Sequence, residues 1–511
     1  SFTAVGQLNQ LWSWGYNTRG EVGNRAHNNY SSPVQIPGTN WSYAARRDAT
    51  AAIKSDGTMW TWGAGDNGRL GHSTNIHLSS PVQLGSDTTW SKVAIGNVSM
   101  LAVKTDNTMW SWGYNNRGNL GLNGPPAISY SSPIQIPGTT WNEPFAGANG
   151  ISAATKTDGT LWVWGHNNLG QVGVNNVANV SSPTQLEGTT WKQLSGENLI
   201  SAATKTDGTL WMWGQNSGGQ LGINDKTARS SPTQLNGFTW KEVTSSSYSF
   251  AATKTDGTLW AWGYNQFGQL GQANRTYYSS PRQIPGTTWS PIKTKSGAVN
   301  ILMATKTDGT LWVSGDNEHG MLGLNDENNR SSPTQIPGSW NAEGLWSGYQ
   351  HLGAIKTDGT LWMWGNFETG GGGDNAPNAK YSSPKQVGTD TTWKHVTGGN
   401  SYTLALKTDG TLWSWGTGSK GRTGHNSQTN YSSPTQVGTD TTWDKLSGGG
   451  DGGRAVKTDG TLWSWGYNRY GQMGQNSSSS PNNHGISSPT QIPGSWDDVA
   501  SNYNIVGALK I

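Results

Sequence analysis

One motif, Lys-Thr-Asp-Gly-Thr-Leu-Trp-x-Trp-Gly, recurs ten times along this 511-residue chain with small variations. Successive copies lie 48 to 52 residues apart. A period this regular is typical of a repeat array, in which each unit buries its hydrophobic face against its neighbours. We therefore expect one ten-unit domain. The first tryptophans of the ten copies are Trp12, Trp60, Trp110, Trp162, Trp211, Trp260, Trp312, Trp362, Trp413 and Trp463.

The unit around Trp260 indicates which elements one repeat contains. Short runs of alternating or apolar residues predict three strands, and Ser-Ser-Pro begins a fourth, edge-type strand where proline is tolerated. Four antiparallel strands repeated about an axis form the blades of a β-propeller, so we expect an all-β fold of ten four-stranded blades. The expected strands are residues 240–243, 249–254, 258–262 and a fourth that begins at 279.

An Asp-Gly dipeptide separates the second and third strands of most units. We predict a two-residue hairpin turn there, because glycine tolerates positive φ. The hairpin residues that we single out are Asp56, Gly57, Asp256 and Gly257.

The chain contains 30 tryptophans, which matches three for each of ten units. One expected tryptophan is replaced by Ser314, and Trp346 is an additional one. Rings at this density must be buried, so we expect them to fill the space between blades. The third-strand pairs assigned to this role include Trp12, Trp14, Trp60, Trp62, Trp110, Trp112, Trp162, Trp164, Trp260 and Trp262.

The two ends of the chain lie inside repeat units. Residues 11–15 match a third strand, and residues 508–511 match a second strand. We predict that these two segments pair and close the ring over residues 9–511, which would leave residues 1–8 as an N-terminal arm. The alternative is an open superhelical array, in which Thr3-Ala4-Val5 supplies a second strand of its own.

Composition excludes several classes of protein. The net charge is only +3 and no block of like charge occurs, which argues against a nucleic-acid partner. The chain has no cysteine, so disulfides and thiolate metal sites are ruled out. No apolar run approaches the length of a membrane span, and residues 1–5 do not resemble a signal peptide.

Catalytic and metal-binding patterns are not found in the sequence. The nine histidines never have metal-ligand spacing. The carboxylates of the hairpin motif sit at equivalent places in separate units, and no nucleophile elbow occurs. We therefore predict a protein that is not an enzyme and that needs no cofactor or metal.

The small-apolar strand, the Asp-Gly hairpin, the Trp-Gly pair and the Gly-x-Asn-x-x-Gly-x-Leu-Gly loop, as in Gly263 to Gly271, resemble the repeat of the RCC1 (regulator of chromosome condensation) family. The resemblance covers essentially the whole chain. It implies a propeller used as a binding scaffold, although the usual ring of the family has seven blades. The family's namesake is a GTPase exchange factor with a basic tail, and this chain has no such tail. The resemblance therefore implies the fold more directly than the activity.

Strand parity predicts two kinds of loop. Turns after the first and third strands share one face, and the segments after the third strands vary between units, as in 24–30, 72–78, 272–278 and 475–486. We interpret this variable face as a recognition surface, with solvent-loop drift as the alternative. The candidate binding residues are Arg25, His27, Tyr30, His72, His77, Arg275, Tyr277, Tyr278, Arg330, Tyr381 and Tyr431.

The constant face carries a lysine at the end of every second strand, from Lys54 to Lys510. Nine units also have an aspartate two residues later. The two charges nearly cancel, so we expect a solvated ring of hairpin tips rather than an anion site.

Our functional hypothesis is a structural or host-recognition component of a phage virion or a bacterial surface, located on the virion or outside the cell. The alternative is a protein-binding regulator or inhibitor, for which the cytoplasm is the alternative location. We expect a protein or a cell-surface glycan as ligand and other subunits of an assembly as further partners. We expect no nucleic acid and no insertion into a membrane.

Overall fold

The computed structural model describes residues 2–5, 10–124, 127–147, 150–197, 199–235, 240–246, 249–290, 300–348, 350–367, 370–399, 401–450, 452–468, 473, 485–502 and 505–510. The chain divides into two compact units, residues 1–29 with 34–238, and residues 30–33 with 239–511. We describe each unit by itself.

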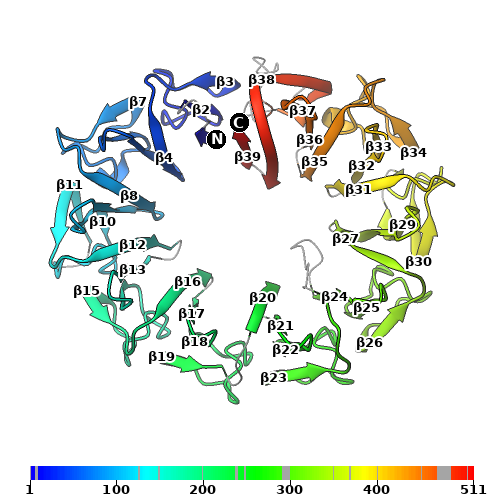
Figure 1. Ribbon diagram of the computed structural model, residues 1–511, viewed down its shortest axis with the longest axis horizontal. Coiled ribbons are helices and arrows are strands. Elements are labelled where there is room, and N and C mark those ends of the chain that lie inside the picture. Colours follow the sequence, from blue (N-terminus) through cyan, green and yellow to red (C-terminus); the bar gives the residue numbers. More distant parts are fainter. Residues whose placement is uncertain are drawn as a thin grey trace. The chain divides into compact units, whose positions relative to one another are not determined.

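Ten antiparallel sheets make up the described residues, one for each repeat, and we call each sheet a blade. Seven blades have four strands that pair in chain order. Within each unit, first strands such as β8 and β31 lie on one side of the row of sheets and fourth strands such as β11 and β34 on the other (Figure 1). The expected all-β architecture with one sheet per repeat is confirmed.

The strands fall into four classes by their place in the blade. First strands are β4 (Trp41–Arg46), β8 (Trp90–Ile95), β12 (Trp141–Ala146), β16 (Trp191–Glu197), β20 (Trp240–Ser246), β27 (Trp340–Ser347), β31 (Trp393–Gly398) and β35 (Trp443–Gly449). Second strands are β1 (Phe2–Val5), β5 (Ala49–Lys54), β9 (Ser99–Lys104), β13 (Ile151–Lys156), β17 (Ile200–Lys205), β21 (Ser249–Lys254), β24 (Ile301–Thr305), β28 (His351–Lys356), β32 (Tyr402–Lys407), β36 (Gly452–Lys457) and β39 (Ile505–Lys510).

Third strands are β2 (Leu11–Gly15), β6 (Met59–Gly63), β10 (Met109–Asn115), β14 (Leu161–Gly165), β18 (Leu210–Gly214), β22 (Leu259–Gly263), β25 (Leu311–Gly315), β29 (Leu361–Phe367), β33 (Leu412–Gly416) and β37 (Thr461–Tyr467). Fourth strands are β3 (Tyr30–Gln35), β7 (Leu78–Gln83), β11 (Ile128–Ile136), β15 (Val180–Gln185), β19 (Arg229–Gln234), β23 (Tyr278–Ile284), β26 (Arg330–Ile336), β30 (Ala379–Gln386), β34 (Tyr431–Gln436) and the first part of β38 (Gly485–Asn502). Two single 3₁₀ turns, η1 (Asp66–Gly68) and η3 (Ser419–Gly421), follow third strands.

The N-terminal residues differ from the prediction. Residues 2–5 form β1, which pairs antiparallel with β2 in the register of a second strand, Ala4 opposite Trp12. At the other end, β39 pairs with β38. The strand beside β2 therefore comes from the predicted arm and not from residues 508–511. A strand six residues away closes a much smaller loop than one from the far end of the chain, so local pairing costs less entropy. Closure into a ring stays a prediction.

The hairpin turn also differs in type from the prediction. The amide of Gly57 donates to Lys54 O at 2.9 Å, and the amide of Lys54 donates to Thr58 O at 2.9 Å. Only Gly57 has positive φ, at 77°. This geometry is a three-residue loop that ends in a left-handed glycine, rather than a two-residue turn. Gly257 has the same conformation, with φ of 78°.

The glycine that ends the motif lies at or near the end of each third strand, where the chain bulges. Pairing between the third and fourth strands shifts register after Ala261, so that Gly263 pairs with Tyr278. The equivalent Gly113 has φ of 105°, and a Cβ there would lie 2.4 Å from Val98 O. A side chain at this position would collide with the backbone of the preceding hairpin.

In at least six blades, a buried tryptophan donates a hydrogen bond to the loop of the preceding blade, whereas Trp62 packs against that loop with its Nε1 unpaired. The indole Nε1–H of Trp213 donates to Gln171 O at 2.9 Å, in the loop of the preceding blade. A Cβ on Gly173 in that loop would lie 2.7 Å from the same Nε1. The second glycine of Gly-x-Leu-Gly is therefore required by the close approach of the next blade's indole. The same bond is made by Trp112, Trp164, Trp364, Trp415 and Trp465.

Ser314, which replaces the tryptophan in one unit, contacts the same loop carbonyl with its shorter side chain. Ser314 Oγ lies 3.4 Å from Gln269 O, the carbonyl that corresponds to Gln171 O. The additional Trp346 does not replace the missing ring. Trp346 lies in β27, the first strand of the next blade. Its ring packs against that of His351 in β28, with the two centroids 5.1 Å apart.

We predict that Trp415→Phe lowers the free energy of unfolding by about 1–3 kcal/mol, because it removes ring volume and one of the two donors to Gly371 O, the other being Thr403 Oγ1. Urea denaturation checks this value. Trp413→Phe is the matched control, since that ring is half-buried and donates to the hairpin residue Thr411. Equal losses of unfolding free energy in the two variants would contradict a special role of the Trp415 indole between blades.

A second prediction concerns His351, which is 1% exposed and has neither ring nitrogen hydrogen-bonded. Burial lowers the pKa of His351 from 6.5 to about 4. The unfolded chain therefore binds a proton between pH 6.5 and 4 that the folded chain does not. Stability should fall by up to about 3 kcal/mol as the pH drops through this window, with no contribution above it.

His351→Ile, which copies Ile301 of the previous unit, should remove this slope when denaturation is followed from pH 7 to 4. Substitution of the exposed His27 by alanine should keep it. An unchanged slope in His351→Ile would show that other groups control the acid response.

Candidate functional site

In five units, one buried asparagine holds the segment that follows the third strand, whereas Gly65, Phe367 and Gly418 stand at this position in three others. Asn265 donates from Nδ2 to Asn274 O and Thr276 O, both at 2.9 Å, and its Oδ1 accepts from the Leu270 amide at 2.9 Å. The residue is 0% exposed. One side chain therefore satisfies three backbone groups of a loop that has no ladder partner.

The arrangement recurs with nearly constant distances. Asn317 donates to Asp326 O at 2.9 Å and Asn328 O at 3.1 Å, and accepts from Leu322 at 2.8 Å. The sequence around these acceptors changes between units, but the contacts are to backbone atoms, so the conformation does not depend on the side chains. The other asparagines that hold two loop carbonyls in this way are Asn17, Asn167 and Asn216.

A second anchor fixes each segment to the neighbouring blade. The Ala273 amide donates to Ser331 O at 2.6 Å, and the Asn325 amide donates to Ser382 O at 2.6 Å. Residues at this position have positive φ, 60° at Ala273. The adjacent edge strand therefore restrains these segments, and in five units the buried asparagine restrains them as well.

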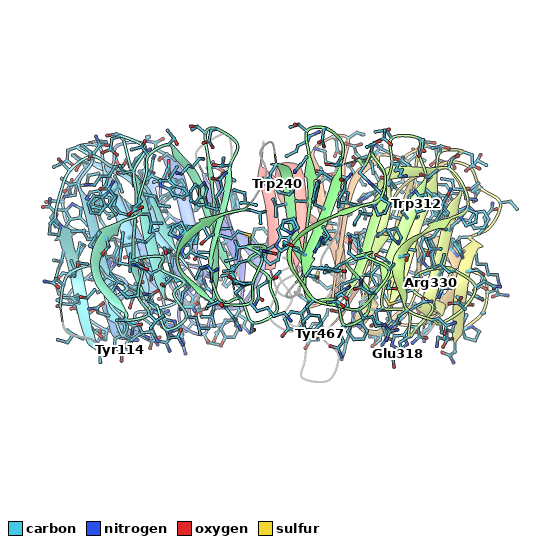
Figure 2. All side chains as sticks on the ribbon, turned by 90° about the horizontal axis from the view of Figure 1, so that it is seen from below. Tyr114, Trp240, Trp312, Glu318, Arg330 and Tyr467 are labelled. Atoms are coloured by element: carbon cyan, nitrogen blue, oxygen red, sulfur yellow. The ribbon has the colours of Figure 1, made fainter. Side chains whose placement is uncertain are left out.

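The variable segments and the hairpins lie at opposite ends of the strands, as strand parity predicts. Within residues 239–511, Glu318 lies beyond the end of β25 and Tyr467 is the last residue of β37, whereas Trp240 and Trp312 lie near the starts of their strands (Figure 2). The variable segments of this unit therefore share one face. The predicted variable segment 475–486 lies outside the described residues except at 485–486.

Three of the eleven candidate residues are exposed, Arg25 and His27 in the first compact unit and Arg275 in the second. Tyr277 is half-buried, and its ring lies 4.6 Å from that of Tyr264. These four side chains are the candidates that the structure leaves accessible to a partner.

Two of the three histidine candidates, His72 and His77, form hydrogen bonds within their own unit. His72 Nε2 lies 2.8 Å from Thr61 Oγ1, and burial lowers the pKa of His72. The Gly65 amide donates to His77 Nδ1 at 3.0 Å. Neither ring is free to bind a ligand in this arrangement.

The aromatic and arginine residues that begin the fourth strands are also used internally. Tyr278 Oη accepts from Asn274 Nδ2 at 2.6 Å. Arg330 forms an ion pair with Asp326, and the hydroxyl of Tyr381 donates a hydrogen bond to the Asp374 carboxylate. The corresponding Tyr431 ring lies 4.3 Å from His425, and Tyr30 is half-buried in β3.

The lysines of the hairpin face are not solvated as the sequence suggested. Lys254 Nζ lies 4.8 Å from the ring centroid of Trp240 and 4.3 Å from that of Trp260. The ammonium is thus held over two indoles by a cation–π interaction. The same pair of contacts occurs at Lys54, Lys104, Lys156, Lys205, Lys306, Lys356, Lys407 and Lys457.

The motif aspartate serves the turn rather than the lysine. Asp256 Oδ1 accepts from the hydroxyl and the amide of Thr258, and these two bonds hold the pKa of Asp256 below its usual value. Thr258 Oγ1 in turn accepts from the Trp260 indole at 2.8 Å. Lys, Asp, Thr and Trp of the motif therefore form one connected structural unit.

One pair of side chains has the spacing of a nucleophile and its base. Ser414 Oγ lies 2.8 Å from His425 Nε2, but Ser414 is 0% exposed and hydrogen-bonds to Thr423 O. No substrate can reach a hydroxyl in this position. Among the described residues, no group of three His, Asp or Glu side chains could hold a metal ion, and no helix is long and apolar enough to cross a membrane.

We predict that Asn265→Ala releases its segment, because two carbonyls and one amide lose their partner. Hydrogen exchange of residues 270–278 should accelerate by about 30-fold or more, which corresponds to a local loss of about 2 kcal/mol or more. Arg275→Ala, in the same segment but exposed, is the control and should leave exchange unchanged. Equal exchange in both variants would refute the role of the buried asparagine.

Comparison with known proteins places these features in a family. The profile of the RCC1-like domain matches residues 2–302, and RCC1 repeat profiles match residues 308–355, 459–507 and 393–422. No curated protein matches the chain.

Solved structures are similar only at low identity. Human WBSCR16 is 21% identical over 65% of this chain and 96% of its own, with a TM-score of 0.43. Yeast RCC1 (Prp20), solved bound to Kap60, is 16% identical over 88% of each chain, with a TM-score of 0.38. Since the RCC1-like domain profile alone matches more than half of the sequence, the chain belongs to the RCC1-like family.

Proposed function

We propose that this protein is a non-enzymatic scaffold that binds a protein partner through its variable segments. The observation that supports the proposal most directly is that five segments, including 272–278 with Arg275 and Tyr277, are fixed by backbone bonds to a buried asparagine such as Asn265. Fixed segments lose little conformational entropy on binding, so different exposed side chains can be displayed without loss of order.

The accessible side chains suit protein recognition. Arg25, His27 and Arg275 offer hydrogen-bond donors, and Tyr277 adds a ring held against Tyr264. Arginine and tyrosine are enriched among the residues that dominate binding energy at protein interfaces. The net charge of +3 and its even distribution give no support to a nucleic-acid partner.

For the setting of this scaffold, we propose the surface of a virion or a bacterial cell, with a free regulator or inhibitor as the alternative. Absence of cysteine and a backbone with 72 glycines are compatible with a durable display protein. Native source material separated on a density gradient distinguishes the two settings. Co-sedimentation with a large particle supports display, and a position near the 54.7 kDa monomer supports the regulator.

The binding surface is tested with alanine variants at Arg275 and Tyr277. The partner is captured from native source material on the immobilised chain and purified, and its affinity is then measured by calorimetry. We expect the double variant to weaken binding by about tenfold or more. The matched control is Ser55→Ala with Thr206→Ala, two exposed hairpin residues. A loss in the control alone would show that the hairpin face binds the partner.

A further inference from the structure

A cavity of about 440 Å³ lies between two neighbouring blades of residues 34–238. One wall comes from the blade β12–β15, with Asn175 and the end of β15 through Glu187. The other comes from the blade β16–β19, with Lys205, Trp211 and Pro232. We call this cavity the Trp211 groove.

The wall formed by Lys205 and Trp211 combines an indole with an available donor. Lys205 Nζ lies 4.3 Å from the Trp211 ring centroid, and both side chains are half-buried. No carboxylate in the described residues lies within salt-bridge distance of Lys205. By contrast, Lys407 pairs with Asp390 at 2.8 Å. The Lys205 ammonium therefore keeps hydrogen-bonding capacity for a ligand.

The conformation of Gly188 helps to keep this donor in place. Its φ is +91°, and a Cβ there would lie 2.9 Å from Lys205 Nζ. The glycine thus allows the ammonium to lie directly against the turn. Any larger residue at this position would displace the ammonium from the groove.

The opposite wall supplies acceptors and amides. Glu187 and Gln185 are exposed at the end of β15, and Asn175 is exposed in the variable segment. One carboxylate faces the groove together with one ammonium, so the lining has no net charge. A lining with both donors and acceptors, no net charge and an aromatic wall matches a neutral ligand rich in hydroxyls.

We propose that the Trp211 groove binds a neutral oligosaccharide, with one hexopyranose ring packed on Trp211. The amides and the two charged groups hydrogen-bond to its hydroxyls, since a hydroxyl both donates and accepts. The volume suits one or two sugar rings, and it lies in the usual range for small-molecule sites. This site goes beyond the protein-binding function proposed above and does not depend on it.

Glu187 makes this groove different from its neighbours. Three other units with a turn of the same length have proline at this position, Pro37, Pro137 and Pro285, and a fourth has Asn236. Glu187→Pro therefore gives this turn the residue of the preceding one, Pro137, and introduces no residue foreign to the fold. The substitution removes one acceptor and leaves Trp211 and Lys205 in place.

The test is calorimetric titration of the full chain with cellobiose, maltose and lactose, and with 3′-sialyllactose as the acidic comparison. We expect saturable binding of at least one neutral disaccharide with a stoichiometry near one. Trp211→Leu should weaken it by about tenfold or more, and Glu187→Pro by about fivefold. Trp110→Leu, beside the Lys104 that is paired with Asp87, is the matched control and should change affinity less than twofold.

Three results would overturn the proposal. The first is no saturable binding of any neutral disaccharide. The second is binding of the acidic sugar alone, which would indicate an anion site on Lys205. The third is binding that Glu187→Pro and Trp211→Leu leave unchanged while both variants keep the wild-type circular dichroism spectrum. Loss of partner binding in the alanine variants at Arg275 and Tyr277, with sugar binding intact, would separate the two sites.

Discussion

The bond from a buried indole to the loop of the preceding blade is the interaction on which the rest of the structure depends. Trp213 donates to Gln171 O, and Ser201 Oγ donates to the same carbonyl at 2.8 Å. The next residue along, Val172, donates its amide to Asn167 at 2.8 Å. One short loop therefore receives the neighbouring blade on one side and the buried asparagine on the other. Packing between blades and the conformation of the variable segment are set by the same few residues.

This coupling explains how a chain with only 32% hydrophobic residues holds a core. The apolar burial is concentrated in rings that lie between blades, where Trp41 contacts both Trp60 and Trp62 at about 6 Å in edge-to-face geometry. The lysine at the end of the second strand covers the outer ring instead of leaving it in water. Polar residues of the motif thus contribute to the same interface as the aromatic ones.

Much of this could be read from the sequence, because the repeat supplies many copies of the same pattern. The period, the strand classes and the hairpins follow from the spacing of residues such as Trp260 and Gly257. The recurrence of Asn265 was visible in the Gly-x-Asn motif, but its role could not be predicted. Its partners are backbone carbonyls of residues that differ between units. Candidates chosen for their chemistry, such as His72 and Tyr381, proved to be used inside the blade, because side-chain type alone does not report direction.

The length of the turn between blades decides whether the lysine at the end of the second strand has a carboxylate partner. In the short turn, Gly188 precedes Trp191 by three residues, and the ammonium of Lys205 lies against the glycine. In the longer turn of three units, two further residues include an aspartate that reaches the lysine, as Asp440 reaches Lys457 at 2.9 Å. The cation–π geometry is the same in both cases, with Lys457 4.1 Å from Trp463. The aromatic contact is therefore sufficient to position the ammonium, and the turn sets only whether its charge is already paired. Blades that are alike in their cores can for this reason differ in what their surfaces offer to a ligand.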